Sequence, residues 1–208
     1  MFWFESNATI TDNSISFEVH GDPQALRRAR LDARNHGHFY NPSGKEEKEF
    51  RDCVGILLQQ SYANVVPTNN VSSDVSQPNP VFSVGDLLVV SLRFLMKRPL
   101  NHFICRNRSM GLKNTSRADD MATLKSKDLD NLVKFCLDSL IGKIYADDAN
   151  IISIQATKEL DCNEYCLGRT VIELVKVSPL SGTLLAPIAI EYNLIIKIWN
   201  LIMKIGFN

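Results

Sequence analysis

The chain has 208 residues, of which 45% are hydrophobic and 22% are charged, and 23 basic side chains balance 23 acidic ones. This length is sufficient for one domain with a buried core, and this composition excludes disordered and collagen-like chains. Because the net charge is zero, composition alone predicts no nucleic-acid partner.

The N-terminal third predicts one strand and one helix separated by a loop. ISFEVH, Ile15 to His20, alternates apolar and polar residues as a half-buried strand does. The arginine-rich residues 22–42 that follow are predicted to be a loop. Ser43-Gly-Lys-Glu46 has the spacing of a capping box and predicts a helix start. The apolar stripe of that helix consists of Phe50, Cys53, Val54, Leu57, Leu58 and Tyr62.

The middle of the chain predicts one strong strand between two insertions. Residues 65–85 are rich in Pro, Asn and Ser and indicate an exposed connector. The run LLVVSLRFLM, 87–96, indicates a strand. Residues 98–127 show no periodicity and are predicted to be a mobile loop. The segment from Arg93 to Lys127 contains nine basic residues and two aspartates. It is therefore strongly basic although the net charge of the whole chain is zero.

The remaining chain predicts a second helix, two strands and a tail. Gly142 is a plausible C-terminal stop for the helix, and residues 151–160 and 169–177 indicate strands. The helical stripe consists of Leu129, Leu132, Val133, Cys136, Leu137, Leu140 and Ile141. We therefore expect an α/β (α+β) domain: a small mixed four-stranded sheet in the order β-α-β-α-β-β, covered by two helices.

Residues 178–208 form an apolar tail, predicted to be helical. Its polar residues Asn193, Lys197, Asn200 and Lys204 recur at steps of four, three and four. These charges argue against a membrane-spanning helix. Packing on the domain or on a partner subunit, a membrane-surface helix and a poorly ordered extension remain open alternatives.

The five cysteines are an odd number without disulfide-framework spacing, and the opening MFWFES has no signal-peptide character. We expect reduced thiols in an intracellular protein, whether in a nucleoid, a nucleus or an organelle according to the host. The alternative is structural zinc, for which His102, Cys105, Cys162 and Cys166 have non-standard spacing.

Four aspartates lie at the two ends of the second helix: Asp128 and Asp130 open it, and Asp147 and Asp148 follow it. Each alone is explained by helix capping or by a turn. Together they exceed what one helix start needs, and neighbouring carboxylates repel one another unless a cation lies between them. Such oxygen ligands suit Mg²⁺ or Mn²⁺, which can activate water for phosphodiester cleavage. Lys134, one turn into the helix, is placed to hold a phosphate oxygen.

The helix imposes a geometric condition on this site. From Asp130 to Ile141 it is about 18 Å long, and the six residues from Gly142 span at most about 20 Å. Asp148 can therefore return to Asp128 with little slack, or the site is completed across a subunit interface.

The pattern KDLDNLVKFCLDSLIGKIYADDANI resembles the signature of RusA-type Holliday junction resolvases, a family of small endodeoxyribonucleases. The resemblance covers roughly residues 15–177, and the order of the N-terminal strand, arginine-bearing loop and helix is similar as well. The matching positions are Asp128, Asp130, Asn131, Lys134, Asp138, Leu140, Asp147 and Asp148.

The resemblance implies a Mg²⁺-dependent homodimer that nicks two opposed strands of a four-way DNA junction in recombination and repair. It implies that Asp128, Asp130 and Asp148 are catalytic metal ligands, with Asp147 beside them, and that Lys134 is the essential basic residue. The basic residues expected to contact DNA phosphates are Arg27, Arg28, Arg30, Arg93, Lys97, Arg98, Lys125 and Lys127.

Three alternatives stay open at this point. Asp119 and Asp120 form a second pair that could supply ligands, although no predicted element fixes it. The same scaffold could bind nucleic acid without catalysis. An Asp-x-Asp motif also occurs in divalent-metal phosphatases and glycosyl transferases.

Overall fold

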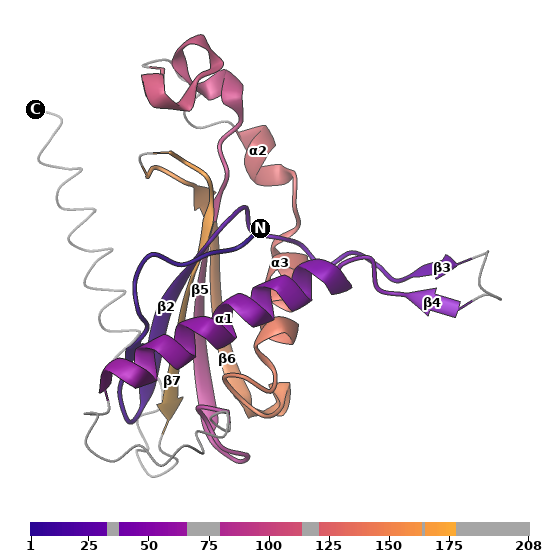
Figure 1. Ribbon diagram of the computed structural model, residues 1–208. Coiled ribbons are helices and arrows are strands. Elements are labelled where there is room, and N and C mark those ends of the chain that lie inside the picture. The colour runs from indigo at the N-terminus through magenta and orange to yellow at the C-terminus, as the bar shows by residue number, and fades with distance from the viewer. Residues whose placement is uncertain (33–37, 66–79, 114–120, 164, 178–208) are drawn as a thin grey trace, which may run out of the picture. The chain divides into compact units, whose positions relative to one another are not determined.

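The structure, a computed structural model, describes residues 1–32, 38–65, 80–113, 121–163 and 165–177 (Figure 1). The chain divides into a compact unit, Met1–Lys176, and a segment, Val177–Asn208. The predicted helical tail, most of the 65–85 connector and the pair Asp119–Asp120 lie outside the described residues. Among the described helices, none combines the length and the apolar character needed to cross a membrane.

The main sheet has five strands in the order β1-β2-β7-β5-β6. β2 pairs with β7 in the antiparallel sense, and β5 pairs with β6 in the parallel sense. The strands are β1 (Thr9–Ile10), β2 (Ser14–His20), β5 (Leu87–Met96), β6 (Ile151–Leu160) and β7 (Arg169–Val177). The four predicted strands are confirmed, but the predicted strand count is wrong. β1 adds a fifth strand, and its two residues are too short to show alternation in the sequence.

Two helices pack on the core as their apolar stripes predict. α1 (Gly44–Val65) crosses the sheet in Figure 1. α3 (Leu129–Leu140) packs against α1, where the ring centres of Phe50 on α1 and Phe135 on α3 lie 5.8 Å apart. α3 ends as predicted, because Gly142 has a φ of 77°, which a residue with a Cβ rarely adopts. Both helices bury residues in the core cluster that also holds Ile15, Phe17 and Leu92.

The arginine-rich segment 22–42 is not wholly a loop, which corrects the sequence prediction. It contains a two-stranded antiparallel ribbon, β3 (Arg30–Asp32) and β4 (His38–Tyr40), which extends beyond the N-terminal end of α1 in Figure 1. Strands of three residues give too little alternation to be recognised from sequence.

Residues 98–113 are also more ordered than the predicted loop. They form three 3-10 turns, and α2 (Met121–Lys125) follows later in the chain. Phe103 is fully buried, and the Arg108 guanidinium lies 4.8 Å from the centre of its ring. Arg108 also donates hydrogen bonds to the carbonyls of Arg98, Tyr165 and Cys166. One cation therefore ties this segment to the turn between β6 and β7.

Candidate active site

The N-terminal end of α3 presents two exposed aspartates. Asp128 is the N-cap residue, in an extended conformation, and its side chain makes no capping hydrogen bond to the described helix. Asp130 is 67% exposed, and one of its carboxylate oxygens lies 3.8 Å from the Lys134 amine one turn further along. Neither carboxylate is used to build the helix start, so both are available to a ligand.

Backbone contacts fix this helix end in place. The Leu26 amide donates to the Asn131 carbonyl at 2.9 Å. The Lys127 amine donates to Asp22 at 2.8 Å and to the Pro23 carbonyl, while the Lys158 amine donates to the Lys127 carbonyl. The segment before the ribbon and strand β6 therefore hold Asp128 and Asp130 from two sides.

The chain after α3 is held against the C-terminal part of that helix. The buried Tyr145 hydroxyl donates to the Leu137 carbonyl at 2.8 Å, which fixes the segment after the helix to the last turn of α3. The Asn150 side chain then anchors the 3-10 turn η5 (Asp148–Asn150) through the carbonyls of Ser83 and Asp86.

Asp147 and Asp148 interact directly with each other. A hydrogen bond between the two carboxyl groups lowers the pKa of Asp147 and raises that of Asp148. The Ala149 amide donates to Asp147 at 3.1 Å and favours its charged form further. Two neighbouring carboxyl groups of like charge are stabilised when a divalent cation lies between them.

A third carboxylate faces this pair from α3. Desolvation raises the pKa of Asp138, and the negative charges of Glu47 and Asp148 raise it further, while Arg51 and Lys134 oppose them. Arg51, on α1, also donates to the Asp138 carbonyl at 3.0 Å. Sequence reasoning missed Glu47 and Arg51, because only the packing of α1 against α3 brings them to this surface.

The structure thus places Asp148 with Asp147 and Asp138, whereas Asp128 and Asp130 lie at the start of α3. Asp128 and Asp138 are about 15 Å apart along the helix axis. In the described parts of the chain, no three His, Cys, Asp or Glu side chains are grouped closely enough to hold a metal ion. The donors are oxygen atoms and fit Mg²⁺ or Mn²⁺ by type, but the described part of one chain does not gather three of them.

Several of the basic residues expected to contact DNA are exposed. Arg28, Arg30, Lys97 and Lys125 all face solvent. Arg27 is half exposed and donates to Glu46 at 2.9 Å, an interaction that leaves part of its guanidinium accessible.

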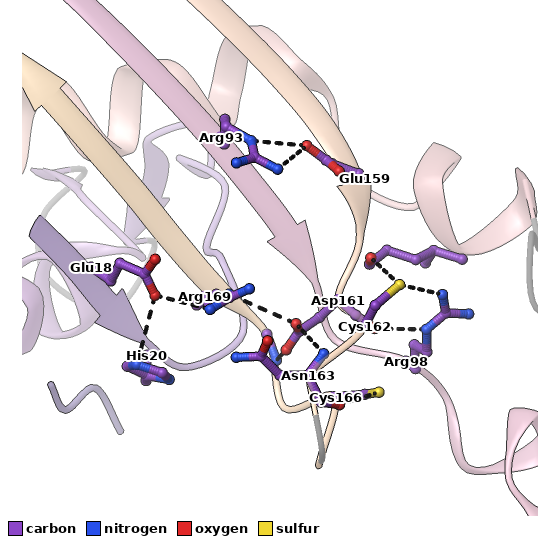
Figure 2. Close-up of polar contacts among 12 residues, drawn as sticks. Glu18, His20, Arg93, Arg98, Glu159, Asp161, Cys162, Asn163, Cys166 and Arg169 are labelled. Carbon is purple, nitrogen blue, oxygen red and sulfur yellow. Dashed lines mark hydrogen bonds and ion pairs between the residues drawn. The ribbon is translucent and has the colours of Figure 1, made fainter. Parts of the chain in front are cut away.

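Three of the expected DNA contacts are engaged within the protein. Arg93 pairs with Glu159 at 3.0 Å on the sheet surface, and Lys127 anchors the start of α3 as described above. Arg98 corrects the sequence prediction, because it is only 3% exposed and donates to the Asp161 carbonyl and to the Cys162 thiol (Figure 2). Its guanidinium holds the β6–β7 turn and does not face solvent.

Residues 20–174 match the family described as Endodeoxyribonuclease RusA. The chain is also 24% identical over 144 residues to the uncharacterized protein YqaN of Bacillus subtilis (strain 168). The matched region covers 69% of this chain and 86% of YqaN. The family match begins at the last residue of β2 and spans both long helices, β5, β6, most of β7 and all four flanking aspartates. The chain belongs to the RusA family of endodeoxyribonucleases.

Proposed function

We propose that this endodeoxyribonuclease is metal-dependent and selects branched DNA, cutting four-way junctions in recombination and repair. Family membership supports the nuclease chemistry. The observation that carries the rest is the pair Asp147–Asp148, two adjacent exposed carboxyl groups that shift each other's pKa. The exposed Asp128 and Asp130, which do not cap their helix, add to this support.

In this proposal Asp128, Asp130 and Asp148 would hold Mg²⁺ or Mn²⁺, with Asp147 beside them. Because the described part of one chain does not gather these acids, the site would be completed across a subunit interface. When bound, such an ion neutralises charge on the phosphodiester and lowers the pKa of a coordinated water. Lys134 donates to a phosphate oxygen, and its side chain, 61% exposed, can turn from Asp130 towards substrate. Asp138 adds negative charge beside Asp148, which strengthens the demand for a cation.

A homodimer is part of the proposal, and strand β6 supports it. β6 lies at one edge of the sheet order, and along the described chain no further strand pairs with its outer side. Ile152 and Ile154 are 47% and 46% exposed on this ten-residue strand. Long apolar edge strands are templates for pairing with another chain. A second copy at this edge gives two equivalent sites, as symmetric cutting of a junction requires.

The test compares cleavage of a synthetic four-way junction with that of a linear duplex, in Mg²⁺ or in EDTA. We expect paired nicks in the junction alone, abolished by EDTA and by Asp130→Asn. Equal cutting of the linear duplex would reduce the proposal to a general nuclease. Asp52→Asn, on the outer face of α1, serves as the matched control and should cut normally.

A second candidate is a nucleic-acid-binding protein without catalysis on the same scaffold. It is favoured by the lack of a three-ligand group within the described part of one chain. Tight junction binding with no Mg²⁺-dependent or Mn²⁺-dependent nicking would support it. An intracellular location belongs to either proposal and agrees with five cysteines that form no disulfide.

A further inference from the structure

The β3–β4 ribbon presents aromatic rings to solvent. Phe39 is 75% exposed and Tyr40 is 48% exposed. In the antiparallel register Tyr40 lies opposite Arg30 and Phe39 lies opposite Leu31, so the two rings belong to opposite faces of the ribbon. A two-stranded ribbon is marginally stable in water, and exposed rings on both of its faces indicate a contact with another molecule.

The basic residues of the same ribbon identify the chemistry of that molecule. Arg28 and Arg30 are exposed, and within the described residues neither forms an ion pair. Arg30 shares a face with Tyr40, so one face carries a guanidinium beside an aromatic ring. Cations beside exposed rings are the combination with which proteins bind single-stranded nucleic acid: the cation contacts phosphate and the ring stacks on a base.

The base of the ribbon is fixed to the candidate active site. The Leu26 amide bonds to the Asn131 carbonyl, one residue from Asp130. The Arg27 amide donates to the Ser43 hydroxyl at 2.9 Å, which joins the incoming arm to the start of α1. From Leu26 to Arg30 an extended chain covers about 13 Å, or about four nucleotide steps of a DNA strand.

We propose that the β3–β4 ribbon is a DNA-binding arm that recognises unpaired bases at a branch point. Tyr40 and Phe39 stack on exposed bases, while Arg28 and Arg30 contact the phosphates of the same strand. Fully paired duplex offers no free base face, so the arm favours branched DNA and directs a strand towards Asp128 and Asp130. This inference rests on the proposed function, and it assigns branch selectivity to residues outside the metal-binding set.

The test measures binding by the full chain in EDTA, so that affinity is separated from cleavage. The probes are a four-way junction with 2-aminopurine at the crossover and a linear duplex of the same length. For Phe39→Ala/Tyr40→Ala we expect junction affinity to fall roughly tenfold or more, with loss of the fluorescence change and duplex affinity unchanged. Phe39→Trp/Tyr40→Trp should restore junction binding, because stacking needs only a ring. Val84→Ala removes an 85% exposed apolar side chain elsewhere and is the control.

The arginine variant separates phosphate contact from stacking. Arg28→Ala/Arg30→Ala should weaken junction and duplex binding alike and reduce the salt dependence of log affinity by up to about two. Lys48→Ala/Lys143→Ala removes the same charge outside the ribbon and should change the salt dependence less.

Three results would overturn the inference. Unchanged junction binding by the aromatic variant removes the stacking role, even when the wild type cuts junctions and the proposed function stands. A changed molecular mass of that variant in sedimentation identifies the rings as a contact between copies of the chain. Equal losses on junction and duplex refute branch recognition. If the wild type never cuts junctions but the aromatic variant still loses selective junction binding, the arm is supported and the proposed nuclease function is refuted.

Discussion

Two groups of carboxylates in this protein have opposite surroundings. At the β6–β7 turn Asp161 is 2% exposed and accepts hydrogen bonds from the Asn163 and Gly168 amides, with Arg169 at 3.8 Å (Figure 2). Arg169 in turn donates to Glu18 at 3.0 Å. Every oxygen of this buried acid has a donor, which is the condition for keeping a charge inside a protein.

On the surface of α3 and η5 the carboxyl groups face one another instead. Asp147 raises the pKa of its neighbour Asp148, and the negative charge of Asp148 raises the pKa of Asp138. Among the described residues, Lys134 and Arg51 oppose this charge at Asp138. The contrast distinguishes acids that stabilise the fold from acids whose repulsion a bound cation or substrate would relieve.

The largest expected effect is on cleavage by the second group. Asp148→Asn should reduce junction cutting in Mg²⁺ by about a thousandfold, or about 4 kcal/mol of transition-state stabilisation, because it removes a metal ligand. Thermal unfolding without metal should show equal or greater stability than the wild type at pH 7, because repulsion from Asp147 is gone.

The pH dependence of that stability difference has a defined sign. The pKa of Asp148 is raised in the folded protein, so its charge destabilises the fold above its ordinary pKa. The advantage of Asp148→Asn should therefore be full at pH 7 and shrink as the pH falls and wild-type Asp148 takes up a proton. A variant less stable than the wild type at pH 7 would place Asp148 with the structural acids.

Asp161→Ala should have the next largest effect, and it should be on stability. Removing one partner of a buried charge cluster costs about 3 kcal/mol, or a fall in unfolding temperature of about 6–12 °C for a chain of this size. Calorimetry measures it, and cleavage by the folded fraction should be normal. Glu159→Ala, which breaks a half-exposed pair with Arg93, is the control and should cost at most about 1 kcal/mol.

This comparison also shows what the sequence could predict. Four strands and both long helices were predicted. Apolar residues recur with a period of two in strands such as β2 and β5, and with a period of 3.6 in α1 and α3. The ribbon, β1 and the ordered segment around Phe103 were not. The ribbon strands and β1 are too short to show a period. The ordered segment around Phe103 depends on contacts between distant residues, such as Arg108 and Tyr165, which are 57 positions apart in the chain.

For the site, the residue types were informative and the environments were not. The carboxylates predicted around α3 are exposed and face one another in part, but the grouping of Asp148 with Asp128 and Asp130 stays a prediction. Arg98 looked like a DNA contact because sequence cannot separate a buried arginine from an exposed one. Asp161, which its surroundings make structural, gave no signal that set it apart from the other aspartates.

A smaller effect should come from the hydroxyl that fixes the segment after α3 to the end of that helix. Tyr145→Phe removes the hydrogen bond to the Leu137 carbonyl and should cost about 1 kcal/mol of stability. Urea unfolding measures this cost. Cleavage should fall as well, because the turn that carries Asp147 and Asp148 is less firmly held on α3. If cleavage is unchanged, the position of that turn relative to α3 does not govern catalysis.

The smallest stability effect should accompany Lys134→Ala. The exposed pair with Asp130 contributes a few tenths of a kcal/mol, although junction cleavage should fall strongly when the phosphate contact is lost.

Lys134 also lowers the pKa of Asp138 against the opposing effects of burial and Glu47. Its small contribution should therefore be present at pH 7 and fade as the pH falls and Asp138 is protonated, because the attraction needs a charged carboxylate. Urea unfolding at pH 7 and at pH 4, beside junction cleavage, separates the two roles. An unfolded variant would show that Lys134 is a structural residue, like Arg169 at the β6–β7 turn. A folded variant that does not cut would show that Lys134 acts with the exposed carboxylates of α3 and η5.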